Sequence, residues 1–296
     1  MTALLAAMLL AGPASCAVND AAARAAIVSD RKDTERWLKD DPSSYLRAVR
    51  RVDFGSRTEL MVGSAEGSDV RLEGVLPRQL KVTAAREGFR VEALDPGASF
   101  GVGGGTKTVP EVREATVGPE TLRVGLYRLR LSHQGFPAII VFDPRSPRVK
   151  GYHGVPYFPV DLSYRYVLSL LPDARGETVT IKSSHSADRR ATRVGWFEFD
   201  AGKTPCRLAA YRLQEPGAGA DELSVFFQDA TTGKETYSVG RYVDPEKQAD
   251  GRYVLDFNMA YSPACAFSKF YNCPIPPKEN RLAVAIRAGQ KDPRYH

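Results

Sequence analysis

The sequence predicts an all-β protein with two antiparallel domains of the sandwich or open-barrel type, preceded by a short helical N-terminal segment. From residue 54 onward, short apolar runs alternate with polar residues at a period of two, which is typical of half-buried strands. Gly, Pro and Asp separate nearly every pair of these runs. With 296 residues, 43% of them hydrophobic, the chain is long enough for two ordinary domains with a core each.

Residues 1–17 are predicted to be a secretory signal. The apolar run Leu4–Leu10 precedes small residues and is too short to span a bilayer. Two small residues stand before Cys16, as at a lipoprotein processing site, where Cys16 would be acylated. An ordinary signal cleaved after Ala17 and a cytosolic N-terminus without a signal are the alternatives. The signal predicts a secreted or periplasmic protein, whose only expected membrane contact is an N-terminal lipid anchor.

Residues 18–52 are rich in Ala, Arg, Asp and Lys and carry few apolar side chains. We expect one or two short helices, interrupted at Asp41-Pro42 because the residue before a proline is disfavoured in a helix. Ser43 or Ser44 can cap the second helix. A partly disordered linker is the alternative for this composition.

Residues 53–145 are predicted to form the first β domain, and the continuously apolar run 137–142 is its expected central strand. The stretch MVGSAEGSDVRL, residues 61–72, followed by Leu80–Val82, resembles the opening of forkhead-associated domains. The resemblance implies a β-sandwich of a kind that binds phosphothreonine peptides.

The phosphate-binding positions of that family are not matched in this sequence. Ser64 stands where the family has its phosphate-binding arginine, and Leu76, Pro77 and Gln79 replace the hydroxyl and histidine of its second motif. Phosphate oxygens need charge-assisted donors. We therefore expect a forkhead-associated-like fold without an intact phosphopeptide site.

Residues 146–296 are predicted to form a second all-β domain of about seven or eight strands. Turn residues punctuate it, for example at Asp200–Lys203. The expected strands are Tyr164–Leu171, Val179–Lys182, Val194–Phe199, Arg207–Leu213, Leu223–Phe227, Tyr237–Tyr242, Tyr253–Phe257 and Leu282–Ile286.

Several functions are not expected. The net charge of +6 is spread mostly as single Arg residues without aromatic interleaving, so nucleic-acid binding is not predicted. The four histidines are isolated, and no HExxH or GxSxG motif is present. The glycine-rich stretch 101–107 lacks the spacing of a dinucleotide or phosphate loop. Neither a metal site nor a cofactor is predicted.

Polar side chains concentrate between residues 229 and 281. Asp256 and Asn258 are two apart on a predicted strand and face the same side; if that side is buried, Arg241 or Arg281 is the expected ionic partner. The cluster is interpreted either as a ligand or catalytic site or as a buried structural network, and no catalytic role is assigned. The ligand-binding candidates are Asp229, Thr231, Tyr237, Arg241, Asp256, Asn258, Tyr261, Glu279, Asn280 and Arg281.

Two cysteines, Cys265 and Cys273, flank a proline-rich loop in this region. In an oxidising compartment they are the natural disulfide partners. Cys206 lies in an alternating pattern and is expected to be a small buried hydrophobe.

The same region resembles the family known as domain of unknown function 1684. The stretches that carry the resemblance are FQDATTGKETYSVGR (227–241), DFNMAYSPAC (256–265) and CPIPPKENRL (273–282), and it extends more weakly back to Lys150. The resemblance implies an all-β fold and no particular activity. It also implies a cysteine pair in members without signals, which favours a metal or thiol role over a disulfide.

We therefore expect an uncharacterised cell-envelope β protein that acts as a binding or assembly module for a protein or small-molecule partner. No nucleophile–base pair is visible, and β-sandwiches commonly present loops to partners. The alternative is a small-molecule enzyme, hydrolase-like, with its polar site in the C-terminal domain. An enzyme requires the polar groups to converge in a cavity, whereas a structural network is buried and mutually paired.

Overall fold

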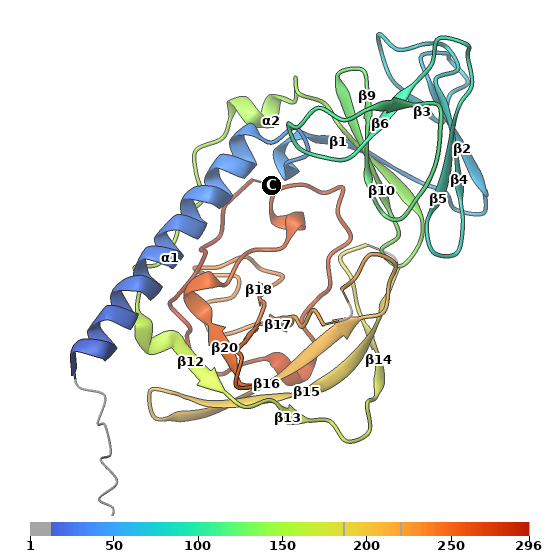
Figure 1. Ribbon diagram of the computed structural model, residues 1–296. Helices are drawn as coiled ribbons and strands as arrows, with labels where there is room; N and C mark the ends of the chain where they lie inside the picture. Colours follow the sequence, from blue (N-terminus) through green and yellow to red (C-terminus); the bar gives the residue numbers. More distant parts are fainter. Residues whose placement is uncertain (1–12, 186, 220, 296) are drawn as a thin grey trace, which may run out of the picture.

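The computed structural model is mostly β, with one long helix near the N-terminus (Figure 1). It describes residues 13–185, 187–219 and 221–295, and side chains from residue 20 onward. The prediction of a mostly β protein with a helical N-terminal segment is confirmed, whereas the division into two sandwich domains stays a prediction. Most of the predicted signal, and the side chain of Cys16, lie outside the described residues. No described helix is long and apolar enough to cross a membrane.

Helix α1, Pro13–Asp40, is one long helix where one or two short ones were expected. No Gly or Pro follows Pro13 within it, and its many Ala, Arg and Lys residues have high helix propensity, so nothing interrupts it. It ends before Asp41-Pro42, as predicted. The expected second helix is only a 3-10 turn, η1 (Tyr45–Arg47), and its N-cap residue Ser44 makes no side-chain cap hydrogen bond.

The N-terminal β region consists of two sheets that share one apolar core. Their strand orders are β1-β11-β10-β9-β6-β7 and β3-β2-β4-β5-β8. Leu60 and Val82 of one sheet meet Leu122 and Leu129 of the other in this core. The strands are β1 (Ala48–Asp53), β2 (Glu59–Gly63), β3 (Val70–Arg71), β4 (Leu80–Ala84), β5 (Phe89–Ala93), β6 (Phe100–Val102), β7 (Glu111–Val112), β8 (Glu114–Val117), β9 (Thr121–Val124), β10 (Tyr127–Ser132) and β11 (Ala138–Phe142).

Strand β11 is buried along its whole length, between β1 and β10. Ile139 and Val141 belong to the N-terminal core. Ile140 and Phe142 pack instead with Tyr271 and other residues of the C-terminal region. Because both faces of the strand are covered, its residues are continuously apolar, and the predicted interior strand is confirmed.

The C-terminal region is built from small sheets joined by irregular chain. One has the order β12-β20-β19, a second is built on the long hairpin β15–β16, and a third is the pair β17–β18. The elements are α2 (Pro147–Lys150), η2 (Leu162–Tyr164), β12 (Arg165–Leu168), β13 (Leu171–Pro172), β14 (Thr178–Ile181), β15 (Arg189–Ala201), β16 (Thr204–Leu213), β17 (Val225–Phe227), β18 (Arg241–Val243), β19 (Glu246–Lys247), β20 (Tyr253–Asp256), η3 (Phe257–Met259), η4 (Ala264–Ala266) and η5 (Lys278–Asn280).

The strand predicted at Leu282–Ile286 is wrong, since this segment is irregular. Its backbone pairs with residues 228–230 at a few points only: the N–H of Leu282 donates to the carbonyl of Gln228 at 2.8 Å, and the N–H of Ala230 to the carbonyl of Val284 at 3.0 Å. At Ile286 side chains take over, since its N–H donates to Asp229 Oδ2 at 2.6 Å and its carbonyl accepts from Arg241 Nη2 at 2.8 Å. Of the strand predicted at Tyr237–Tyr242, only the end is formed, as part of β18. The residues before Arg241 form a turn instead.

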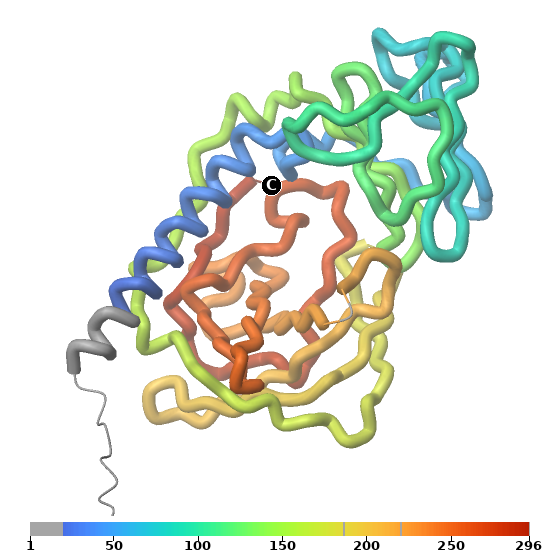
Figure 2. Tube along the Cα trace, in the orientation of Figure 1, coloured from blue at the N-terminus to red at the C-terminus, as the bar shows by residue number. Residues whose placement is uncertain are grey.

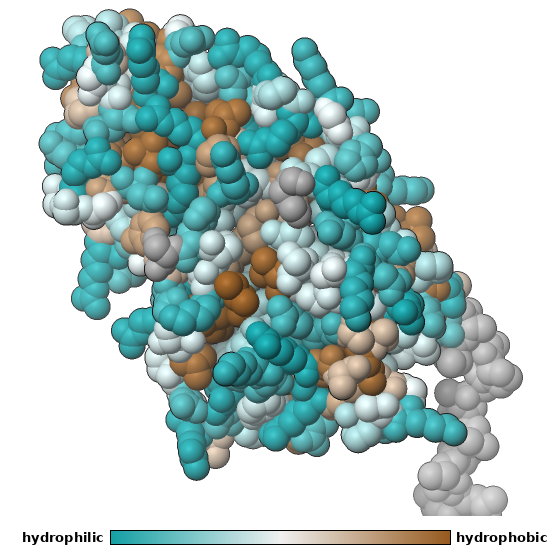
Figure 3. Space-filling view, turned by 180° about the vertical axis from the view of Figure 1, so that it is seen from behind, coloured by the Kyte–Doolittle hydropathy of each residue, from teal (hydrophilic) through white to brown (hydrophobic). Residues whose placement is uncertain are grey.

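Helix α1 runs along the side of the C-terminal region, and the N-terminal sheets pack at one end of that region (Figures 1 and 2). Ile27 and Leu38 anchor the helix, with 2% and 1% exposure. Leu38 packs with Leu46, Val155 and Phe267. The surface on the opposite face from Figure 1 is mostly hydrophilic with small apolar patches (Figure 3), as is usual for a folded chain.

Candidate functional site

A cavity of about 560 Å³ lies between helix α1 and the C-terminal region. Eight residues of α1 form one wall, and the segments around β18 to η4 form most of the other. The lining residues from α1 are Ala23, Ala26, Ile27, Asp30, Asp33, Thr34, Trp37 and Leu38. These positions recur at spacings of three and four residues, so they share one face of the helix.

Two arginines fix α1 over the cavity. Arg24 donates from Nη1 to the carbonyl oxygen of Val160 at 3.0 Å, and Arg31 donates in the same way to Phe158 at 3.0 Å. The Arg31 guanidinium also lies 4.5 Å from the ring centroid of Tyr157, a cation–π arrangement. The helix is therefore held by polar contacts at its flank and by apolar burial beneath it.

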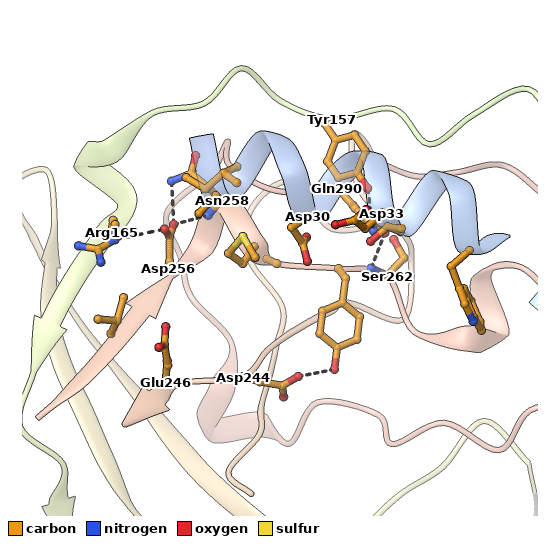
Figure 4. Close-up of a pocket in the computed structure, with 18 of the residues that line it drawn as sticks. Asp30, Asp33, Tyr157, Arg165, Asp244, Glu246, Asp256, Asn258, Ser262 and Gln290 are labelled. Atoms are coloured by element: carbon orange, nitrogen blue, oxygen red, sulfur yellow. Dashed lines mark hydrogen bonds and ion pairs between the residues drawn. The ribbon is translucent and has the colours of Figure 1, made fainter. Parts of the chain in front are cut away.

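Asp256 and Asn258 form the buried floor of the cavity, where β20 runs into η3 (Figure 4). Asp256 Oδ1 accepts from the backbone N–H of Asn258 at 2.9 Å and from its Nδ2 at 2.8 Å. Arg165, opposite Asp256 in the β12–β20 pair, places Nε 3.5 Å from Asp256 Oδ2. Asn258 also exchanges two hydrogen bonds with the backbone of Asp161, at 2.9 and 2.8 Å. These groups are therefore held in fixed orientations.

Tyr261 and Asp244 form the wall opposite α1. Tyr261 Oη donates to Asp244 Oδ2 at 2.9 Å, and Ser224 Oγ donates to Asp244 Oδ1 at 2.8 Å. Desolvation by the surrounding protein raises the pKa of the Asp244 carboxyl, although both hydrogen bonds lower it. Desolvation, together with the nearby Asp244 carboxylate, raises the pKa of Tyr261 well above its usual value, so its hydroxyl stays protonated.

Asp30 faces these groups from the helix. Desolvation raises the pKa of its carboxyl, the neighbouring Asp33 adds to the effect, and Arg31 opposes it. Asp33 itself pairs with Arg36 at 2.8 Å on the exposed side.

A buried hydroxyl in the cavity wall lacks a partner. Ser262 is 2% exposed, and its Oγ makes no hydrogen bond within the described chain. Its backbone N–H donates to Gln290 Oε1 at 2.9 Å, and Gln290 Nε2 donates to Tyr157 Oη at 3.3 Å. The Oγ atom has essentially no accessible surface, so it is buried behind the cavity wall and does not face the open space.

The cavity has an acidic mouth. Asp30 and Asp33 are exposed on the α1 side, and Asp244 and Glu246 are exposed on the opposite side. Figure 4 shows these carboxylates on both sides of the space. Arg165 is the single basic residue among those lining the cavity.

Three other predicted candidates, Asp229, Thr231 and Arg241, form a buried network away from the cavity. Asp229 Oδ2 lies 3.2 Å from Arg241 Nη2, and Thr231 Oγ1 donates to Asp229 Oδ1 at 2.7 Å. Arg241 also donates to the carbonyls of Ile286, Ala288 and Gln290. Burial lowers the pKa of Arg241 to about 10, against the pull of Asp229. The network holds residues 286–290 in place.

The remaining candidates lie apart from both groups. Glu279 accepts from Tyr211 Oη at 2.7 Å, and Arg281 is exposed. Asn280, with 0% exposure, bonds the backbone of Ala209 and Phe226. Tyr237 Oη donates to the carbonyl of Cys265 at 3.3 Å. The predicted cluster is thus divided over several places.

The predicted disulfide is not formed in the structure, because Cys265 and Cys273 are both free. The N–H of Cys265 donates to Cys273 Sγ at 3.3 Å. A hydrogen bond from the Cys273 thiol lowers the pKa of Cys265 in spite of its burial, and the same bond raises the pKa of Cys273 well above its usual value. The two thiols are therefore in contact without a covalent link. Cys206 is buried, as predicted.

Of the ten candidates, Asp256, Asn258 and Tyr261 reach the cavity. Sequence reasoning missed Asp30, Asp33, Asp244, Glu246 and Arg165. The three-and-four spacing on α1 is a signal for the first two, since it marks a helix face. Nothing in the sequence indicates what that face covers.

The structure is that of a mostly β protein with a cavity that an N-terminal helix closes on one side. Residues 150–291 match the model of a family described as a protein of unknown function (DUF1684), so the C-terminal part of this chain belongs to the DUF1684 family. An uncharacterized protein of Haloarcula marismortui, known from a solution NMR structure, is 33% identical; the match covers 52% of this chain and 83% of that one, with a TM-score of 0.41. No curated protein matches the chain. Helix α1 lies outside the family match.

Proposed function

We propose that this chain is a small-molecule-binding protein whose site is the cavity between α1 and the DUF1684 domain. The observation that carries the proposal is a cavity of about 560 Å³ whose lining combines apolar side chains with Asp256 and Asn258 held in fixed orientations. Small-molecule sites are typically about 300–1,000 Å³, mostly apolar, with a few placed polar groups. Ile27, Leu38 and Met259 supply the apolar part here.

Binding is better supported than catalysis. Nucleophilic catalysis needs a nucleophile within hydrogen-bond reach of a base, and the Ser262 hydroxyl has no such neighbour among the described residues. Asp256 is already engaged by Asn258 and Arg165, and the Tyr261 hydroxyl donates a hydrogen bond to Asp244. The hydrolase-like alternative would need these contacts to rearrange.

The location and the N-terminal region belong to the same proposal. The apolar run Leu4–Leu10 before Cys16 supports an envelope protein, secreted or lipid-anchored. The two sheets around one core support a forkhead-associated-like unit at residues 53–145, with Ser64 in place of the phosphate-binding arginine. In this proposal that unit serves assembly, and the cavity serves ligand binding.

The experiment is a thermal-shift screen of the full chain against small molecules of all charge types, with hits measured by calorimetry. Ala26→Trp fills the cavity from α1, whereas Ala25→Trp places the same side chain at an exposed neighbouring position that does not line it. We expect hits to bind the unaltered chain and Ala25→Trp but not Ala26→Trp, with all three folded by circular dichroism. An absence of hits, or equal binding by Ala26→Trp, would contradict the proposal.

A further inference from the structure

The chemistry of the cavity indicates the class of its ligand. We propose that it binds an organic cation, a protonated or quaternary amine on an apolar body. This inference rests on the proposed binding function. Its motivation is the combination of exposed carboxylates and aromatic walls in one cavity.

The distribution of charge is the first argument. The chain as a whole carries a net charge of +6, yet the lining of this cavity has five carboxylates and one arginine. Asp256 is engaged by Arg165, and Asp33 by Arg36. Asp244 and Glu246 remain on one side of the mouth, and Asp30 remains on the other with Arg31 beside it. A cleft lined by one sign of charge attracts ligands of the opposite sign and repels its own.

Aromatic side chains are the second argument. The cavity is lined by Trp37, Tyr45, Tyr261 and Phe267, together with Tyr157, whose ring already carries the Arg31 guanidinium. The negative faces of aromatic rings attract ammonium groups, and aromatic cages are a known means of holding methylated amines. Apolar neighbours such as Leu38 and Val254 can cover the carbon part of the same ligand.

A metal ion fits the site less well than an organic cation. Among the described residues, no three His, Cys, Asp or Glu side chains lie close enough together to hold one. The carboxylates are instead spread around the mouth, which suits an amine whose charge enters between them.

The affinity for such a ligand depends on pH. Asp30 is surrounded by Asp33 and Arg31, and Asp244 by Glu222, Ser224 and Tyr261. The pKa values of both carboxyls are raised in the free protein. A bound cation stabilises their ionised forms, so affinity rises as the pH increases through these pKa values.

The test is calorimetry on the full chain with cadaverine and choline as cations, pentanediol as the neutral counterpart of cadaverine and glutarate as its anionic counterpart. We expect the cations to bind, more weakly at high salt, and the other two not to bind. Asp30→Asn and Asp244→Asn should each weaken cation binding about two- to fivefold. The control Asp250→Asn removes a charge from the exposed Asp250–Arg252 pair between β19 and β20 and should leave it unchanged.

The outcomes separate this inference from the proposed function. If pentanediol or glutarate binds as tightly as cadaverine, the ligand class is wrong and the binding function stands. If Asp250→Asn weakens cation binding as much as Asp30→Asn and Asp244→Asn do, the effect comes from the overall charge of the protein, and the cation does not bind in this cavity. If neither cation binds, the inference fails, and the screen with Ala26→Trp then decides the binding function by itself.

Discussion

The carboxylate of Asp229 and the guanidinium of Arg241 form an ion pair 3.2 Å long, with side-chain exposures of 0% and 1%. Both residues come from the segment that carries the family resemblance. Their contacts all lead to backbone and side chains of the same domain, so the pair holds the irregular chain 286–290 in place of a strand ladder. A buried pair of this kind is costly to break, because it leaves one charge without a partner.

Asp229→Ala is therefore expected to lower the free energy of unfolding by about 3–5 kcal/mol. The variant removes the carboxylate that opposes the lowering of the Arg241 pKa by burial, so the guanidinium is left buried without its ionic partner. Urea unfolding measures the change. Asp250→Ala, which breaks the exposed pair with Arg252, should change the free energy of unfolding much less, because water screens that pair. Similar losses in both variants would show that burial of the Asp229 pair is energetically unimportant.

Asn280→Leu should destabilise the chain by about 3 kcal/mol, because Leu keeps the size but leaves buried backbone groups unsatisfied. Asn280 Oδ1 accepts from the N–H of Ala209 at 2.7 Å, and Nδ2 donates to the carbonyls of Ala209 and Phe226 at 2.9 and 2.8 Å. The neighbouring and exposed Arg281→Ala should change the stability by less than about 0.5 kcal/mol. Denaturant midpoints of the two variants compare them directly, and a neutral Asn280→Leu would refute the structural role.

Cys265 should be alkylated faster than Cys273, because its pKa is lowered by the Cys273 thiol and because Cys273 is buried. Brief iodoacetamide treatment followed by peptide mass spectrometry measures the two rates. Cys273→Ala removes the hydrogen bond and should slow the reaction of Cys265 at neutral pH. Faster labelling of Cys273 would contradict this. Under a disulfide oxidant, the pair is expected to lose two hydrogen atoms in mass, as the sequence predicts.

Asp244→Asn should become more stable relative to the unaltered chain as the pH rises. The folded-state pKa of Asp244 is raised, so its contribution to stability is fully present below the unfolded-state pKa and is lost as the pH rises through the folded value. Asn carries no such dependence. Urea unfolding of both proteins across the acidic range gives the difference, and a difference that does not vary with pH would contradict the raised pKa.

Much of the β architecture could be predicted from the sequence. The alternation of apolar and polar residues in Tyr127–Ser132 indicates a strand with one buried face. The continuously apolar run 138–142 indicates a strand that is buried on both faces. The segment Leu282–Ile286, predicted as a strand, pairs its backbone with residues 228–230 at a few points only, and at Ile286 the side chains of Asp229 and Arg241, distant in sequence, bond it instead. Apolar alternation alone does not distinguish such a segment from a strand.

The site was less predictable than the fold. Asp256, Asn258 and Tyr261 follow one another along the chain from β20, so they reach the same cavity. Asp30 is more than two hundred residues away from them in sequence and joins them only because α1 packs across the domain. The residue spacing in a sequence indicates which side chains share one face of a helix. Only the tertiary packing determines which other residues that face contacts.

The two-sided burial of β11 has a consequence for how the chain folds. Ile140 and Phe142 on one side of the strand are covered by Tyr271 and Cys273, while Ile139 on the other side belongs to the N-terminal core. Separating the two halves would bring a strip of apolar surface into contact with water, at a cost of roughly 25 cal/mol per Å². The halves are therefore expected to unfold together in one cooperative transition, and a fragment that ends after β11 would be prone to self-association through the strip it exposes.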